Sequence, residues 1–283
     1  MENRGAVKIM AGIILRWLGG GGGDTIMNLL SHSNDVYTNI HATNKIDPAT
    51  GRSLISEKFD EDYPSFYDMA LTTKDIDSKA LKQDIVKLNS KKDTFLLKSH
   101  HWDKKLDKDI CDIVDIVNIG YTIAFIPFIV RANLHKTPTL ANSKLKNKTY
   151  FDYPLSKIAK KLTDKQHVKI VTWNIITDLI NKARIFNLEN ATITIADIFY
   201  NRDHLKTYFQ SRSLKLDITS DYLNQWVEQN KKFLPSKTFQ NYIDNTNYNH
   251  IDSSLDMVER YTLLALSGKN FQFIDYKVTK NNT

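Results

Sequence analysis

The feature that most constrains the fold is an unbroken run of five glycines, Gly19 to Gly23, which holds half of the ten glycines in the chain. Residues 7–18 before it are almost continuously apolar, as in a buried strand, whereas residues 24–30 after it repeat apolar side chains at the spacing of an amphipathic helix. A strand, a glycine loop and a helix in this order aim backbone N–H groups and the positive helix end at an anion. Glycine also lets a phosphate approach the main chain closely. The sequence therefore predicts an anion-binding loop, and the alternative is a flexible linker.

The composition is that of a globular protein with a substantial core, since 41% of the 283 residues are hydrophobic and 25% are charged. No segment approaches the roughly 18 uninterrupted apolar residues of a membrane-spanning helix, so we expect no membrane span. The charges of Lys8 and Arg16 within the first apolar stretch argue against a signal peptide. The single cysteine, Cys111, excludes an intrachain disulfide and fits a reducing compartment, so we expect a cytoplasmic protein. The net charge of +7 indicates affinity for anions, although nothing specific predicts a nucleic-acid partner.

Strand-like and helical patterns alternate along the rest of the chain. Strands are expected at 93–100, 121–131 and 192–195, and helices at 77–88, 108–117, 170–185, 204–212 and 222–233. This alternation predicts an α/β fold with a mostly parallel central sheet flanked by helices. We expect one domain over residues 1–283, with a polar insertion around 44–92 and a frayed tail at 277–283.

The glycine loop differs from the phosphate-binding loop of ATP and GTP hydrolases. That loop ends in Gly-Lys-Ser/Thr, whereas this one reads Gly23-Asp24-Thr25, with an acid in place of the lysine. Asp24 is expected to cap the following helix. Thr25 either offers its hydroxyl to a phosphate or only begins that helix.

A second candidate segment ends the expected strand at 93–100. Lys98 and His100 are two residues apart, so in an extended chain both project to the same side. A histidine there could remove a proton from an attacking hydroxyl while the lysine stabilises charge on a leaving oxygen. The alternative is an ordinary exposed strand end.

A third candidate segment begins at Arg131, which ends the longest apolar run. Its guanidinium fork suits a phosphate, and Thr139 could add a second contact. The alternative for Arg131 is a structural pair with a carboxylate. Because ligands of parallel sheets bind at the carboxyl ends of strands, the three segments are expected to form one site.

Together the three segments resemble motifs of the P-loop sulfotransferases, which move a sulfuryl group from the donor PAPS to an alcohol or amine. That family has a loop of the form Pro-Lys-Ser-Gly-Thr-Thr after its first strand, Lys-Thr-His at the end of a later strand, and Arg followed eight residues on by Ser. In the same order this chain has Gly20-Gly21-Gly22-Gly23-Asp24-Thr25, then Lys98-Ser99-His100, then Arg131 with Thr139. The resemblance covers roughly residues 7–140.

The resemblance implies a P-loop nucleotide-binding fold, no metal, and a hydroxyl-bearing small molecule or glycan as the acceptor. It implies that residues 20–25 hold the 5′-phosphosulfate of PAPS and that Arg131 and Thr139 hold the 3′-phosphate. It also implies that His100 is the general base and Lys98 stabilises the bridging oxygen. The family's loop lysine corresponds to Gly21 here, and its late Arg-Lys-Gly motif has at best a fragment at Ser267-Gly268-Lys269.

Two other functions remain open at this point. Because Gly21 replaces the loop lysine, the first is a degenerate relative that binds a partner or glycan without chemistry. The second is another glycine-loop transferase, such as an S-adenosylmethionine-dependent methyltransferase. That enzyme would hold a ribose with an acid at the end of its second strand, where this chain has Lys98 and His100. The sequence indicates neither the acceptor nor the oligomeric state.

Overall fold

The computed structural model describes residues 12–17, 22–32, 36–38, 40–47, 51, 53–57, 78–91, 94–99, 102, 104–135, 164–246, 248 and 250–268. The strands are β1 (Gly12–Arg16), β2 (Ile40–Ile46), β3 (Ser53–Glu57), β4 (Phe95–Ser99), β5 (Asp115–Gly120) and β6 (Ile193–Thr194). The first α-helices are α1 (Gly23–Leu30), α2 (Ser78–Lys91), α3 (Lys104–Ile110), α4 (Ile126–His135) and α7 (Asp164–Ile185). The later ones are α8 (Ile195–Tyr200), α9 (Arg202–Gln210), α10 (Asp221–Asn230), α11 (Lys237–Asn245) and α12 (Met257–Leu266). Short 3-10 turns lie at Ile123–Phe125, Leu188–Asn190 and Lys231–Phe233.

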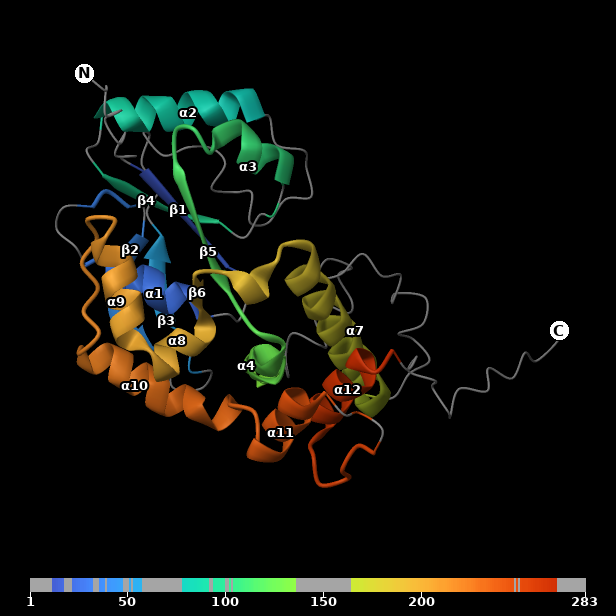
Figure 1. The fold of residues 1–283 in the computed structure, drawn as a ribbon. Coiled ribbons are helices and arrows are strands. Elements are labelled where there is room, and N and C mark those ends of the chain that lie inside the picture. The colour runs from blue at the N-terminus through green and yellow to red at the C-terminus, as the bar shows by residue number, and fades with distance from the viewer. Residues whose placement is uncertain are drawn as a thin grey trace, which may run out of the picture. The chain divides into compact units, whose positions relative to one another are not determined.

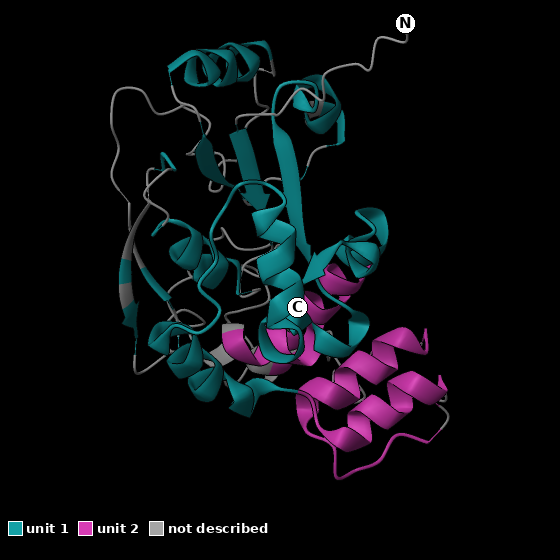
Figure 2. Cartoon of the chain, turned by 60° about the vertical axis from the view of Figure 1, so that its left-hand side comes forward, with its two compact units in different colours: residues 1–125, 182–234 teal, residues 126–181, 235–283 magenta. Residues whose placement is uncertain are grey.

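The chain divides into two compact units (Figure 2). Unit 1 comprises residues 1–125 and 182–234, and unit 2 comprises residues 126–181 and 235–283. Unit 1 holds the sheet and the glycine segment, whereas the described part of unit 2 is helical.

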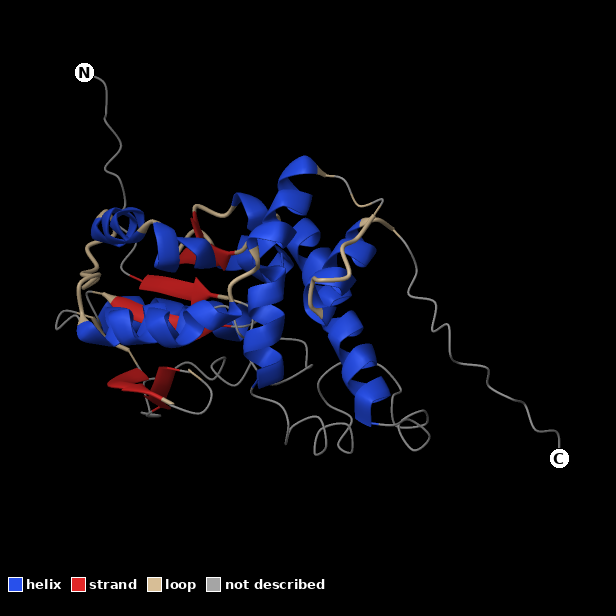
Figure 3. Cartoon of the chain, turned by 90° about the horizontal axis from the view of Figure 1, so that it is seen from below, coloured by secondary structure: helices blue, strands red, loops and turns tan. Residues whose placement is uncertain are grey.

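Unit 1 is built on a four-stranded parallel sheet in the order β4-β1-β5-β6, with a separate antiparallel pair of β2 and β3 (Figures 1 and 3). This confirms the expected α/β class with a parallel sheet flanked by helices. The chain leaves β1 toward β4 on one side and leaves β5 toward β6 on the other. In open parallel sheets, ligands bind where neighbouring strands send their connections in opposite directions, here at the carboxyl ends of β1 and β5.

Alternation along the strands gives the sheet two different faces. On one face Ile14, Phe95 and Leu97 form a buried core with side chains of α2 and α3. On the other face Trp17, just after β1, packs against the start of α1, since a Cβ on Gly23 would lie 2.1 Å from the Trp17 ring. The sheet therefore has α2 and α3 on one side and α1 on the other (Figure 1).

Two expectations about secondary structure are wrong. Instead of a strand over 121–131, a 3-10 turn leads into α4, whose residues 126–130 are all buried. A helix that is buried all round carries the same continuous apolar run as a buried strand, and proline is well tolerated in a first helical turn, where Pro127 lies. Instead of a helix over 108–117, α3 ends at Ile110 and β5 begins at Asp115.

Candidate functional site

The glycine segment ends where α1 begins. Gly22 precedes the helix with φ of 69°, a left-handed conformation that glycine adopts without strain. A Cβ on Gly22 would also lie only 3.0 Å from Ile198 Cδ1. Gly22 offers no side-chain cap to this helix end, and the backbone N–H groups of Thr25 and Ile26 donate to the Gly22 carbonyl oxygen at 3.0 and 3.3 Å. The N–H groups of Gly23 and Asp24 are therefore the donors that this helix end can offer to a ligand. Asp24 lies in the first turn and does not act as the expected cap.

Lys98 brings a positive charge to this helix end. Its Nζ lies 3.4 Å from Oδ1 of Asp24, and its side chain is only 11% exposed. Nζ also lies 5.8 Å from the centre of the Trp17 ring, which is consistent with Lys98 and Trp17 sharing the α1 face of the sheet. The ammonium group therefore sits beside the first turn of α1, where Asp24 partly neutralises it.

The Thr25 hydroxyl faces the interior of unit 1. Thr25 is 1% exposed, and its Oγ1 lies 2.7 Å from Oγ of Ser53 on β3. Tyr222 of α10 donates its phenol hydrogen to the same Ser53 oxygen. Burial raises the pKa of Tyr222, and its hydrogen bond with Ser53 offsets part of that rise. The three hydroxyls form a buried, uncharged network that ties α1 and α10 to β3.

A polar row that the sequence reasoning missed crosses the carboxyl ends of three strands. Ser99, Arg16 and Asn118 are register partners on β4, β1 and β5, so they share one face of the sheet, opposite Lys98. Arg16 is 3% exposed; Nη1 donates to Oδ2 of Asp107 at 2.7 Å, and Nη2 pairs with the other carboxylate oxygen. Its Cζ lies 5.2 Å from the centre of the Trp102 ring. In the sequence, the signal for this row is Arg16, a charged residue within an otherwise apolar strand.

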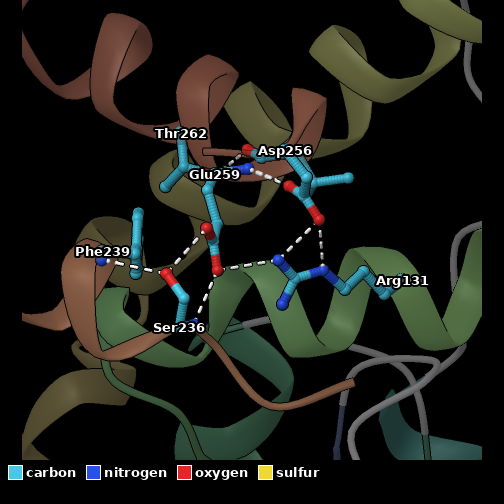
Figure 4. A network of polar contacts seen from close by, with 7 residues as sticks. Arg131, Ser236, Phe239, Asp256, Glu259 and Thr262 are labelled. Carbon is cyan, nitrogen blue, oxygen red and sulfur yellow. Dashed lines mark hydrogen bonds and ion pairs between the residues drawn. The ribbon is translucent and has the colours of Figure 1, made fainter. Parts of the chain in front are cut away.

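Arg131 lies in unit 2, in the second turn of α4 rather than at a strand end, and holds two carboxylates (Figure 4). Nε and Nη2 donate to Oδ2 of Asp256 at 2.9 and 2.6 Å, and Nη2 lies 2.7 Å from Oε1 of Glu259. Glu259 is 2% exposed and also accepts from the backbone N–H and the hydroxyl of Ser236. Arg131 thus takes the structural role that was the alternative for it in the sequence.

The remaining predicted site residues, His100, Gly20, Gly21 and Thr139, lie outside the described residues. The structure therefore brings together Gly22, Gly23, Asp24 and Lys98 at one end of α1. Arg131 belongs to the other unit.

A hollow of about 380 Å³ lies at the opposite end of α1. Its lining comprises Leu29, His32, Asp217, Ser220, Asp221, Tyr222 and Gln225. The hydroxyl of Thr219 and the backbone N–H of Thr219 donate to Asp217, and these bonds lower the pKa of its carboxyl. None of the predicted site residues that the structure describes lines this hollow.

The described part of the chain contains no cluster of three histidine, cysteine or acidic side chains that could hold a metal ion. None of the helices in those ranges is long and apolar enough to cross a membrane.

Comparisons with protein families, with curated proteins and with solved structures found no match to this chain.

Proposed function

We propose that this chain is a cytoplasmic, P-loop-type transferase that binds PAPS at the N-terminus of α1 and passes its sulfuryl group to a hydroxyl-bearing small molecule or glycan. The observation that supports this best is the Lys98 ammonium beside the uncapped first turn of α1, at the carboxyl edge of the sheet. A helix N-terminus and a nearby cation both attract an anionic group such as a phosphosulfate.

In the proposed reaction, an acceptor oxygen attacks the sulfur of PAPS. A new S–O bond forms as the bond between sulfur and the bridging phosphate oxygen breaks, and adenosine 3′,5′-bisphosphate leaves. Lys98 stabilises the negative charge that builds on that bridging oxygen. By the motif resemblance, His100 takes the proton from the acceptor hydroxyl.

Asp24 has a defined effect on this proposal. Its carboxylate lies 3.4 Å from Lys98 Nζ, so it competes with the ligand for the same cation and repels a bound phosphate. Replacing it by asparagine removes the negative charge and keeps the size of the side chain. Asp24→Asn is therefore expected to bind the bisphosphate more tightly than the natural chain.

The test is calorimetric titration of adenosine 3′,5′-bisphosphate into the natural chain and three variants. A hydrogen bond to a charged group contributes about 1.5–3 kcal/mol, so Lys98→Met should weaken binding roughly 10- to 100-fold. Lys82→Met is the matched control, because Lys82 also pairs with a carboxylate, Asp112, but lies on α2. No binding to the natural chain, or equal binding by Lys98→Met, contradicts the proposal.

A second candidate is a protein that binds the nucleotide without catalysing transfer. The Asp24–Lys98 ion pair favours it, because it lowers the charge available to a transition state, and Gly21 stands where the family has lysine. Binding of the bisphosphate with no sulfated product across a panel of hydroxyl acceptors, measured by mass spectrometry, would favour this candidate. Turnover that Lys98→Met abolishes would exclude it.

A further inference from the structure

Arg16, Trp102, Asp107 and Asn118 form the Arg16 cluster. Three buried polar atoms of this cluster lack a hydrogen-bond partner among the described residues. Arg16 Nε, Trp102 Nε1 and Asn118 Oδ1 are out of contact with bulk water and have no hydrogen-bond partner within the part of the chain that the structure describes. Leaving one such atom unpaired costs about 1–3 kcal/mol. Native proteins contain few of these atoms, and a group of three needs a physical explanation.

The three residues are neighbours. Arg16 Cζ lies 5.2 Å from the centre of the Trp102 ring, and Arg16 is the register partner of Asn118 on the adjacent strand. Arg16 is the last residue of β1 and Asn118 lies two residues before the end of β5, near the point where the connections diverge and where sheets of this kind bind ligands. This position is independent of Lys98, which faces the other side of the sheet.

The chemistry of these atoms selects a ligand. Asp107 occupies the Nη1 and Nη2 end of the Arg16 fork, and Nε has no acceptor within the described structure. The Nε–H of Arg16 and the indole N–H of Trp102 are two donors that suit oxygens of one anion, whereas Asn118 Oδ1 accepts a hydrogen. A singly protonated phosphate group provides acceptor oxygens and one P–OH donor.

We propose that Arg16, Trp102 and Asn118 form a second anion site that binds a small phosphate group. Arg131 shows within the same chain that one guanidinium accommodates two anionic groups, since it contacts both Asp256 and Glu259. The phosphate would be the second anionic partner of Arg16, at Nε, beside Asp107 at Nη1 and Nη2. This site goes beyond the proposed transferase function and does not depend on it.

The test follows the indole N–H resonances of the four tryptophans by NMR during titration of the full chain. The probes are inorganic phosphate, methyl phosphate and acetate, and each resonance is assigned with a Trp→Phe variant. The Trp102 resonance reports binding at the proposed site. The Trp17 resonance reports binding at Lys98, whose Nζ lies 5.8 Å from the centre of the Trp17 ring, and Trp173 in unit 2 is the control. We expect a saturable downfield shift of the Trp102 indole N–H resonance with phosphate or methyl phosphate. Whichever of the two binds more tightly shows whether the site prefers a free phosphate or a phosphate ester. Acetate, which lacks the hydroxyl for Asn118, should bind more weakly.

Two variants separate this site from others. Arg16→Lys keeps the charge but removes the Nε side and should abolish the saturable Trp102 shift, and the other three indole resonances report whether it folds. Asn118→Val should lower the affinity for phosphate about tenfold, as expected for the loss of one hydrogen bond to a charged group. Lys98→Met should leave the Trp102 shift intact, so failure of the transferase proposal is distinguishable from failure of this one. A Trp102 resonance that phosphate does not move overturns the inference, as does a shift that Arg16→Lys and Asn118→Val both retain.

Discussion

Arg16 in unit 1 and Arg131 in unit 2 are both largely buried arginines paired with aspartate, yet their surroundings differ. The side chains are 4% and 16% exposed. Arg131 contacts two carboxylates, and Glu259 is further satisfied by two donors of Ser236 (Figure 4). Arg16 contacts one carboxylate and keeps an unpaired Nε within the described structure.

The difference separates a structural role from a binding role. A buried ionic network whose members are all satisfied fixes the packing of its helices, here α4, α12 and the start of α11. A buried charge with one open side keeps a capacity that a ligand or a water molecule can fill. The arginine first assigned to the ligand is therefore the structural one, and the arginine in the first strand is the better candidate for binding.

The largest expected effect comes from Glu259→Gln, which breaks the satisfied network. The amide nitrogen of glutamine must face Arg131 or one of the Ser236 donors, and the site is 2% exposed, so water cannot compensate. We expect the free energy of unfolding to fall by about 3–5 kcal/mol, measured by chemical denaturation. Asp112→Asn is the control, because its exposed pair with Lys82 should contribute less than about 1 kcal/mol. A loss no larger than that of the control would remove the contrast between the two arginines.

Asp107→Asn makes the same chemical change in the Arg16 cluster and should cost less, about 1–2 kcal/mol. The Asp107 side chain is 29% exposed, so the amide can turn toward water. Inorganic phosphate should restore part of this stability, because a ligand that binds only the folded state stabilises it by mass action. Arg16→Lys, which lacks the proposed phosphate site, should gain no such stability from phosphate. Equal recovery in Arg16→Lys would show that the effect does not come from the Arg16 cluster.

Local patterns predicted much of unit 1. The apolar run before the glycines, the helical spacing after them and the strand at 93–100 correspond to β1, α1 and β4. Each of these segments is bounded by residues that end an element, such as the glycines, or shows a clear periodicity of apolar residues. The run at 121–131 has neither, because a completely buried helix and a completely buried strand both read as continuous apolar sequence.

The polar partners could not be predicted from local patterns. Arg16 pairs with an acid 91 positions away, and Arg131 with one 125 positions away. Such distances depend on which strands become neighbours, and no single-sequence periodicity carries that information. Lys98 was found because it ends a recognisable strand, but its pair with Asp24 depends on the register of β1 and β4.

The smallest expected effect concerns the uncharged network of Thr25, Ser53 and Tyr222, which tests whether charge or burial makes a polar group costly to change. Tyr222→Phe removes one hydrogen bond to Ser53 and should lower the free energy of unfolding by about 1 kcal/mol at neutral pH.

Burial raises the pKa of Tyr222 in the folded state, so the unfolded chain releases the phenol proton at lower pH than the folded one. Stability should therefore fall as pH rises above the ordinary tyrosine value of about 10 and level off once the folded pKa is passed. The variant should show a shallower fall than the natural chain in denaturation curves taken across this range. Because burial also raises the pKa values of Tyr208 and Tyr261, some alkaline loss should remain in the variant, and an unchanged slope would mean that Tyr222 ionises equally easily in both states.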